Sequence, residues 1–417
     1  MHGNRNPAVI HHTPIPGIKA FAVLSALESA ARGILVSVLP IAMYRIFADA
    51  KLVSEVYFFI GVLSLATALF IPWVSRLLPR RWLYTIATIA YIVGSGICVF
   101  SDNWVFAVGL GLMTLAVVVI TVCFNAYVMD YIARSKLGEV ETLRLFYSGA
   151  AWSIGPFLGI WLMSLWEPAP FILAWFAACC LLVAFWRLRL GNGKAIQKAS
   201  TKPPNPFAYL DRFRRQPRLI AGWTFAVIRS CAWWVYVVYL PIYAVENGFS
   251  EQLGGILLSL SNAFLFLTPL MLKAMRGYVR KAIILGFSGS AVLFLLASLE
   301  FSGPAIAIGL LLAASLFLIL LDMSAGLPFL MAVRPSERTE MSAVYSTYRD
   351  VSGVVTPGVA SLMLISLPLQ MMFGVTAIAL FSCSLLATRL HPRLGKKRPS
   401  PMVSIQPVEE SWADSRG

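Results

Sequence analysis

Residues 103–130 read NWVFAVGLGLMTLAVVVITVCFNAYVMD, and no charged side chain occurs in this stretch before Asp130. A helix needs about 20 apolar residues to cross the hydrocarbon core of a bilayer, so this stretch is long enough to span a membrane. The whole chain has the same character, because 59% of its 417 residues are hydrophobic and only 13% are charged. A soluble domain carries about a quarter charged residues. The sequence therefore predicts an integral membrane protein and argues against a cytosolic enzyme, a secreted disulfide scaffold or a nucleic-acid-binding protein.

Stretches of similar length, with no charge or only isolated charges, recur along the chain and predict an all-α membrane protein with twelve transmembrane helices. The expected spans are 20–44, 52–75, 82–101, 103–130, 144–166, 168–186, 219–245, 252–272, 282–299, 302–333, 341–366 and 368–388.

The spans form two groups of six, which we expect to be two helix bundles at 20–186 and 219–388. A basic linker, 187–218, lies between them, and the tails are 1–19 and 389–417. The first tail lacks the charged start, short apolar run and small-residue site of a cleaved signal peptide.

The distribution of basic residues predicts the orientation in the membrane. Of the 34 Lys and Arg residues, 29 lie in segments that share one side of the bilayer, and only Arg45 and Lys51 fall in loops on the other side. Lys and Arg concentrate on the cytoplasmic side of membrane proteins. We therefore expect both termini to be cytoplasmic, in the inner or plasma membrane of the cell. This bias also accounts for the net charge of +15 without a nucleic-acid partner.

Two short motifs recur at the same spacing and indicate an internal repeat. Leu39-Pro40-Ile41 matches Leu240-Pro241-Ile242, and Tyr147 followed by Pro156 matches Tyr348 followed by Pro357, each at an offset of 201 residues. Parallel six-helix repeats are one architecture of secondary transporters, with the substrate site near the midplane between the halves. The four prolines predict bends that help the halves rock.

At these features the chain resembles the major facilitator superfamily, over about residues 18–390. Gly155-Pro156-Phe157-Leu158-Gly159 resembles the core of the family's antiporter motif GPxxGG, although Ile160 replaces its last glycine. The family motif GxxxDRxGRR corresponds to 72–81, PWVSRLLPRR, which keeps the basic end but lacks the glycines and the acid. The resemblance implies alternating access by a monomer, in a divergent branch of the family whose substrate should not be borrowed from other members.

Ionisable residues inside the spans are the first candidates for function, because charges at membrane depth are costly. Glu28 and Arg32 lie one helical turn apart in the first span and can pair with each other. Acids in the first span couple protons in exporters of the family, so the resemblance implies this role for Glu28. A self-neutralising structural pair is the alternative.

Arg229 lies near the middle of the seventh span, and the 201-residue offset maps it onto Glu28. Three roles are open for it: a salt bridge to Glu28 across the two halves, an anion-binding group for substrate, or a structural charge. Its guanidinium suits carboxylate or phosphate, so Arg32 and Arg229 are candidate substrate ligands.

Further charges are candidates for gating or ion pairing. Asp322 in the tenth span could pair with Arg349 in the eleventh, next to Asp350, as a structural pair or a state-dependent gate. Asp130 and Arg144 flank the loop between the fourth and fifth spans and resemble the family's inner-surface latch. Charges inside the spans balance, so charge alone does not name the substrate.

Aromatic and small residues complete the candidate site. Trp152, Trp233 and Trp234 accompany the charged positions and suit an amphiphilic organic ligand, although packing is the alternative, and the sequence does not decide which of Trp233 and Trp234 faces inward. Gly155 and Gly159 permit close helix approach, whereas Pro156 and Pro357 bend their helices.

Nothing in the sequence indicates a cofactor, a metal site or an enzyme. The six cysteines lie in apolar runs without a CxxC pair, the four histidines lie near the ends of the chain, and no GxxxxGK[ST] motif occurs. We therefore predict a secondary transporter that exports a small amphiphilic organic compound in exchange for protons. Proton-coupled uptake of a small organic anion is the alternative, and a non-transporting assembly factor or sensor on the same fold is a third hypothesis.

Overall fold

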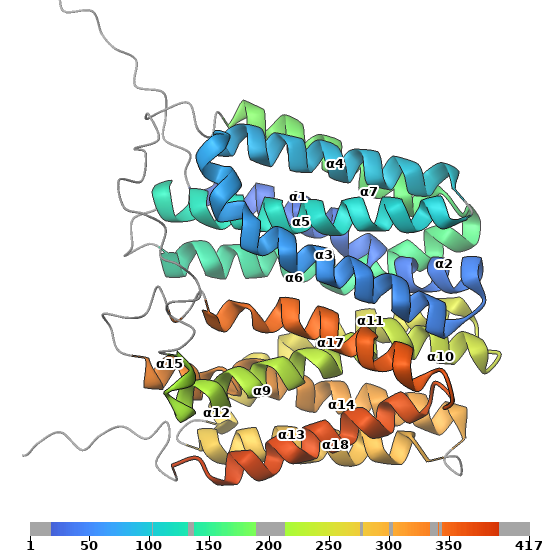
Figure 1. Ribbon diagram of the computed structural model, residues 1–417, viewed down its shortest axis with the longest axis vertical. Coiled ribbons are helices and arrows are strands. Elements are labelled where there is room, and N and C mark those ends of the chain that lie inside the picture. Colours follow the sequence, from blue (N-terminus) through green and yellow to red (C-terminus); the bar gives the residue numbers. More distant parts are fainter. Residues whose placement is uncertain are drawn as a thin grey trace, which may run out of the picture.

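A computed structural model describes residues 18–101, 103–131, 137–188, 213–275, 278–299, 303–333, 341 and 344–391. Every regular element within these ranges is a helix (Figure 1). The tails and most of the basic linker lie outside them. Asp130 and Arg144 occupy helices, but their side chains are not among those described, so their predicted latch stays a prediction.

The helices of the first half follow one another with short connections. They are α1 (Ile18–Leu35), α2 (Val38–Phe47), α3 (Ala50–Leu77), α4 (Arg80–Phe100), α5 (Trp104–Tyr131), α6 (Leu137–Leu165) and α7 (Ala169–Arg187).

The helices of the second half are more often interrupted. They are α9 (Pro217–Trp234), a π-helical turn η2 (Val235–Tyr239), α10 (Leu240–Glu246), α11 (Glu251–Ala263), a 3₁₀ turn η3 (Phe264–Leu267), α12 (Thr268–Met275), α13 (Val279–Ala297), α14 (Pro304–Ser324), α15 (Leu327–Ala332), α17 (Tyr348–Met363) and α18 (Met371–Thr388).

Eleven helical stretches of the described chain are long and apolar enough to cross a membrane, and the protein is a multi-pass integral membrane protein. They coincide with the first ten predicted spans and the last. The predicted span 341–366 contains α17, which has 16 residues and is shorter than the about 20 that a crossing requires. The count of twelve therefore stays a prediction.

The two halves of the chain lie side by side (Figure 1). Helices α1 to α7 pack on one another, and so do α9 to α18. The main contacts between the halves are those of α3 with α17 and of α6 with α11. These four helices therefore frame the space between the halves.

Prolines interrupt the first helix of each half at matching places. Helix α1 ends at Leu35 and α2 begins at Val38, just before Pro40. In the second half, η2 precedes Pro241. Proline lacks an N–H and clashes with the carbonyl of the preceding turn, and a wider π turn relieves that clash. Pro156 and Pro357 lie inside continuous helices.

The glycines of the GPxxG motif lie where α6 crosses α1. A Cβ atom on Gly155 would lie 2.6 Å from the carbonyl carbon of Gly33, and one on Gly159 would clash with the carbonyl oxygen of Ile34. The side chain of Ser37 in the break of α1 donates to the carbonyl of Pro156 at 2.7 Å. The motif therefore joins the broken first helix closely to α6.

Several bonds tie the halves together at the end that carries α2 and α10. Arg45 lies at that end and contacts Glu167 of the first half (Nη1 to Oε1, 2.5 Å) and Glu251 of the second (Nε to Oε1, 2.5 Å). Nearby, the hydroxyl of Tyr239 donates to Ser54 across the halves at 3.0 Å. In the predicted orientation this end faces outside.

Candidate functional site

A cavity of about 970 Å³ lies between the halves and is lined by both. This volume is within the range of small-molecule sites. Five charged side chains line it, which are Arg32, Arg229, Asp322, Arg349 and Asp350. Glu28 pairs with one of them, Arg32, so the three positive groups around the cavity are balanced by three negative ones.

The first half contributes an ion pair within one helix. Glu28 and Arg32 are four residues apart on α1, and Arg32 Nη1 lies 2.8 Å from Glu28 Oε1. The guanidinium of Arg32 also lies over the ring of Trp152, at 5.4 Å from its centroid. The side chain of Glu28 is 19% exposed, so its carboxylate is mostly shielded from solvent. We call Glu28, Arg32 and Trp152 the first-half cluster.

The second half contributes an ion pair between two helices. Arg229 on α9 places Nε 3.0 Å from Oδ1 of Asp322 on α14. The indole N–H of Trp233 donates to the other oxygen of Asp322 at 3.0 Å. Tyr348 lies under the guanidinium of Arg229, 5.3 Å from ring centroid to Cζ. We call Arg229, Asp322 and Trp233 the second-half cluster.

The buried Nε of Arg229 has an ion-pair contact but no hydrogen-bond partner among the described residues. At 3.0 Å the distance suits a hydrogen bond, so the direction of the N–H is what excludes one. A buried donor without an acceptor is costly. Because this Nε is buried against Asp322, a ligand in the cavity can reach Arg229 only through its other guanidinium nitrogens.

Two of the pairings that the sequence leaves open are not those of this structure. Glu28 does not reach Arg229 across the halves, because Arg32 lies one turn away on the same helix and takes its carboxylate. Asp322 pairs with Arg229 instead of Arg349, because α14 packs against α9. Arg349 lies over Tyr348, with Nε donating to its hydroxyl at 3.0 Å.

Both adjacent tryptophans of α9 line the cavity. Trp233 faces Asp322, whereas Trp234 makes an edge contact with Tyr57 of the first half, with centroids 5.8 Å apart. The structure brings Trp152 into the same cavity wall. Gly155, Pro156 and Gly159 pack against α1 and α11 instead, so they shape the helices and do not contact a ligand there.

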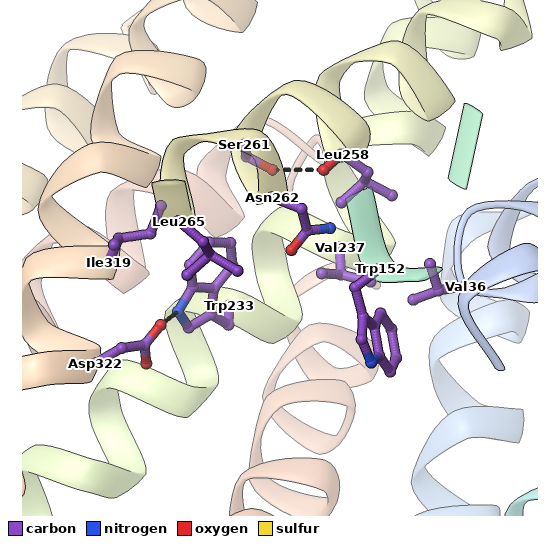
Figure 2. Close-up of a pocket in the computed structure, with 10 residues that line it drawn as sticks. All are labelled: Val36, Trp152, Trp233, Val237, Leu258, Ser261, Asn262, Leu265, Ile319 and Asp322. Atoms are coloured by element: carbon purple, nitrogen blue, oxygen red, sulfur yellow. Dashed lines mark hydrogen bonds between the residues drawn. The ribbon is translucent and has the colours of Figure 1, made fainter. Parts of the chain in front are cut away.

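A recess of about 250 Å³ opens beside the cavity and shares Val36, Trp152, Trp233, Val237 and Asp322 with it. Its remaining lining comes from α11, η3 and α14, namely Leu258, Ser261, Asn262, Leu265 and Ile319 (Figure 2).

Asn262 is a site residue that sequence reasoning missed. An amide in the middle of the largely apolar stretch 253–272 was the available signal, but one amide within a span is compatible with packing between helices. Tyr57 and Tyr91 also line the cavity, and nothing in the sequence distinguishes them from other aromatic residues in apolar spans. Tyr348 also lines the cavity, and the repeat with Tyr147 marks its position in the sequence. Within the described residues, no three His, Cys, Asp or Glu side chains come close enough to hold a metal ion.

The fold is shared with solved transporters at low sequence identity. The nucleoside transporter NupG is 14% identical, with a TM-score of 0.64 that covers 89% of this chain and 98% of that one. A POT family transporter in complex with 5-aminolevulinic acid is 12% identical, with a TM-score of 0.73 over 93% and 100% of the two chains. A POT family transporter in complex with a thioalcohol conjugated peptide is 13% identical, with a TM-score of 0.72 that covers 89% of this chain and 95% of that one. These identities establish the fold alone.

The sequence model of the Major Facilitator Superfamily matches residues 21–357, which is most of the chain. The chain belongs to the Major Facilitator Superfamily. No curated protein sequence matches it. As a member of the Major Facilitator Superfamily it is a secondary transporter for a small-molecule substrate, embedded in the membrane, and not an enzyme.

Proposed function

We propose that this transporter exports a small amphiphilic organic compound in exchange for protons. The observation that carries the proposal is the cavity between the halves, whose wall combines three tryptophans with charged groups from both halves. Aromatic surface binds the apolar part of such a ligand, and a few polar groups fix its orientation. The cavity would open alternately to the two sides as the halves rock around it, and opening at the end that carries Arg45 would require its contacts with Glu167 and Glu251 to break.

Glu28 is the proposed proton-coupling group. Its carboxylate is mostly shielded from solvent and holds Arg32, which lines the cavity. A proton on Glu28 would neutralise the carboxylate and release the guanidinium into the cavity. Protonation of Glu28 and the positive charge that Arg32 presents to a ligand would then be linked through the 2.8 Å contact between these two residues.

The remaining parts of the proposal follow from the charge bias and the family. Both termini face the cytoplasm, the transporter lies in the inner or plasma membrane, and it works as a monomer of twelve spans. Nucleic acid is not a partner, because the basic residues lie on one side of the predicted spans. Anionic lipid headgroups are the natural neighbours of that side.

Proton-coupled uptake of a small organic anion is the second candidate. The observation in its favour is that Arg32, Arg229 and Arg349 line the cavity, because a guanidinium suits a carboxylate or a phosphate. Export and uptake differ in the side on which substrate accumulates, so one experiment separates them.

The test compares metabolites inside and outside cells that lack the protein, express it, or express Glu28→Gln. We expect one compound to accumulate outside only with the intact protein. In vesicles, Glu28→Gln should abolish transport driven by a proton gradient but retain exchange of that compound. Glu55→Gln is the control, because Glu55 pairs with Lys51 at 3.8 Å at the end of the molecule near Arg45.

Accumulation inside the cell would replace export by uptake. Full uphill transport by Glu28→Gln would remove Glu28 from the coupling. If no compound changes under any growth condition, transport itself is contradicted.

A further inference from the structure

The recess beside the cavity carries a single charged side chain. Of the ten described residues that line it, only Asp322 is ionisable. This side chain is 36% exposed, so a ligand can reach its carboxylate. Each of its two oxygens already contacts one nitrogen, Nε of Arg229 and Nε1 of Trp233, both at 3.0 Å. A carboxylate has about four acceptor sites, so about two of them stay open to a ligand.

The charges around Asp322 disfavour a charged group in the recess. An anion there would meet the carboxylate of Asp322, and none of the described lining residues is basic. A cation would meet a carboxylate that Arg229 already neutralises. It would also lie beside Trp152, whose ring carries the guanidinium of Arg32 at 5.4 Å from its centroid. Burial of a charge without a counter-charge of its own is costly, so the group that fits the recess is uncharged.

An uncharged hydrogen-bond donor can use the open acceptor sites of Asp322 without this cost. A hydrogen bond from an O–H or N–H to an ionised group is stronger than one between two neutral groups. The other polar side chains of the described wall are neutral. Ser261 donates to a backbone carbonyl of its own helix at 2.9 Å. Asn262 forms no side-chain hydrogen bond within the described chain, and its carboxamide is directed toward the space between Trp152 and Trp233 (Figure 2). The recess therefore suits a polar but neutral group.

Two tryptophans from different halves form aromatic walls that are held in place before any ligand arrives. Trp233 donates to Asp322 and makes an edge contact with Tyr236, at 5.6 Å and 88°. Trp152 lies under the guanidinium of Arg32. Ordered side chains lose little conformational entropy on binding. The recess is therefore a preformed slot between the two indoles.

The size and lining of the recess suit one planar ring rather than a whole ligand. Its volume is about 250 Å³, below the about 300 Å³ at which complete ligand pockets begin. Apart from the tryptophans, most of its wall is aliphatic, from Val36, Val237, Leu258 and Leu265. Aromatic rings prefer edge or offset contacts with other rings. A planar ring gains such contacts with the indoles, in addition to apolar burial.

We propose that the recess binds an uncharged aromatic ring of the substrate that carries an O–H or N–H donor. The ring lies between Trp152 and Trp233, and its donor bonds an open acceptor site of Asp322. The substrate is therefore a phenol or an N–H heteroaromatic compound whose ring group is neutral at physiological pH. This assignment rests on the proposed transport function and names the class of compound that the same site takes.

Binding of five related probes to the purified transporter in nanodiscs tests the assignment, with empty nanodiscs to subtract partition into lipid. All are N-(2-arylethyl)acetamides or a saturated analogue. Four differ in the para substituent of a benzene ring, which is hydroxyl, methyl, carboxylate or ammoniomethyl, and the fifth carries the hydroxyl on a cyclohexane ring.

We expect the aromatic hydroxyl probe to bind most tightly. The methyl group has a similar size but no donor, and should weaken binding about tenfold, the effect of one hydrogen bond to a charged group. Saturation of the ring should weaken binding about threefold, because the aromatic contacts are lost. Both charged probes should bind more weakly than the methyl probe, because the recess gives them no counter-charge.

Two variants assign the effects to residues. Asp322→Leu combined with Arg229→Met replaces the buried ion pair by apolar side chains and leaves no unpaired charge. This double variant should bind the hydroxyl and the methyl probe equally. Trp152→Leu should erase the difference between the aromatic and the saturated hydroxyl probe. The ranking of the probes by the unmodified protein tests the assignment even where a variant does not fold.

Each variant has a matched control. Lys51→Gln combined with Glu55→Gln removes another ion pair, with a distance of 3.8 Å, whose residues do not line the recess. Trp161→Leu removes the indole of an α6 residue that is 46% exposed and does not line the recess. Both controls should rank the five probes like the unmodified protein.

Equal affinity for the hydroxyl and the methyl probe, or tightest binding of either charged probe, would overturn the assignment. So would equal affinity for the aromatic and the saturated ring, binding of none of the five probes, or a double variant that still prefers the hydroxyl. Each of these results concerns the ligand class alone, because proton-driven export is measured separately by the comparison of Glu28→Gln with the intact protein. The expected ranking in a protein that exports nothing would contradict the transport function and not the ligand class.

Discussion

The first-half and second-half clusters use the same three kinds of side chain in different ways. Each has an arginine, a carboxylate and a tryptophan beside the cavity. In the first half the pair lies within α1, and the arginine is 37% exposed. In the second half the pair joins α9 to α14, and the arginine is 10% exposed. The carboxylates reverse this order, since Glu28 is 19% and Asp322 36% exposed. The pairs therefore differ in that one lies within a helix and the other joins two helices.

This contrast predicts different contributions to stability. A pair between neighbouring turns of one helix contributes little, so loss of the Glu28–Arg32 contact should leave the structure intact. A buried charge without its partner is costly, so loss of Asp322 should leave the buried guanidinium of Arg229 without compensation. The second-half pair is therefore expected to contribute more to the stability of the fold than the first-half pair.

Loss of each carboxylate gives the largest expected difference. Asp322→Asn should lower the free energy of unfolding by about 3 kcal/mol, because it leaves a buried guanidinium unpaired. Glu28→Gln should lower it by less than about 1 kcal/mol, because the partner is exposed. Unfolding by titration with a denaturing detergent in mixed micelles measures both changes in the free energy of unfolding.

The double variant Asp322→Asn with Arg229→Gln is the control for this prediction. It removes both charges and should recover most of the lost stability, because no unpaired charge is left. Equal destabilisation by Asp322→Asn and Glu28→Gln would contradict the distinction between the clusters.

The sequence predicts the local parts of the site better than the distant parts. The Glu28–Arg32 pair follows from a four-residue spacing, which places two side chains on one helix face. The Arg229–Asp322 pair joins residues 93 positions apart, as their numbers show, and depends on which helix packs beside α9. The sequence pattern and the composition do not show which helix packs beside α9. From the sequence, Arg349 is therefore as plausible a partner for Asp322 as Arg229 is.

Membrane crossings are predictable because the bilayer imposes a length and an apolar composition on each. Eleven of the predicted spans match described helices on that basis. Details inside a span are not predictable in the same way. Pro241 predicts a bend in its helix, but the form of the π turn at Val235–Tyr239 and of the 3₁₀ turn at Phe264–Leu267 does not follow from composition. The second of these, η3, contributes Leu265 to the recess.

The glycines of the first half offer a smaller test of how the halves differ. Gly155→Ala should destabilise the protein by about 2 kcal/mol, because its Cβ meets the backbone of Gly33 and overpacking has that cost. The corresponding residue of the second half at the 201-residue offset is Thr356, which carries a side chain at that place. The crossing of α1 and α6 thus has a glycine where the corresponding position of the second half has a threonine.

Gly149→Ala is the matched control on the same helix. A Cβ there meets no atom within 4 Å, and alanine is favoured over glycine in a helix by up to about 1 kcal/mol. The two changes should therefore have opposite signs in the same unfolding measurement. A stabilising Gly155→Ala would show that α1 and α6 are not in close contact.

Arg45 gives the smallest expected effect, and it differs from both clusters because it bonds to both halves. Its contacts with Glu167 and Glu251 hold one end closed only in the conformation seen here. Exposed ion pairs contribute up to about 1 kcal/mol, so Arg45→Gln should raise the population open at this end by no more than about fivefold. Spin labels on Phe100→Cys and Gln252→Cys, in a protein without its native cysteines, report the separation of the halves. Lys51→Gln is the control, since Lys51 pairs with Glu55 within the first half, and it should leave the distance distribution unchanged. An equal shift in both variants would mean that net charge at this end, and not the bond between the halves, sets the equilibrium.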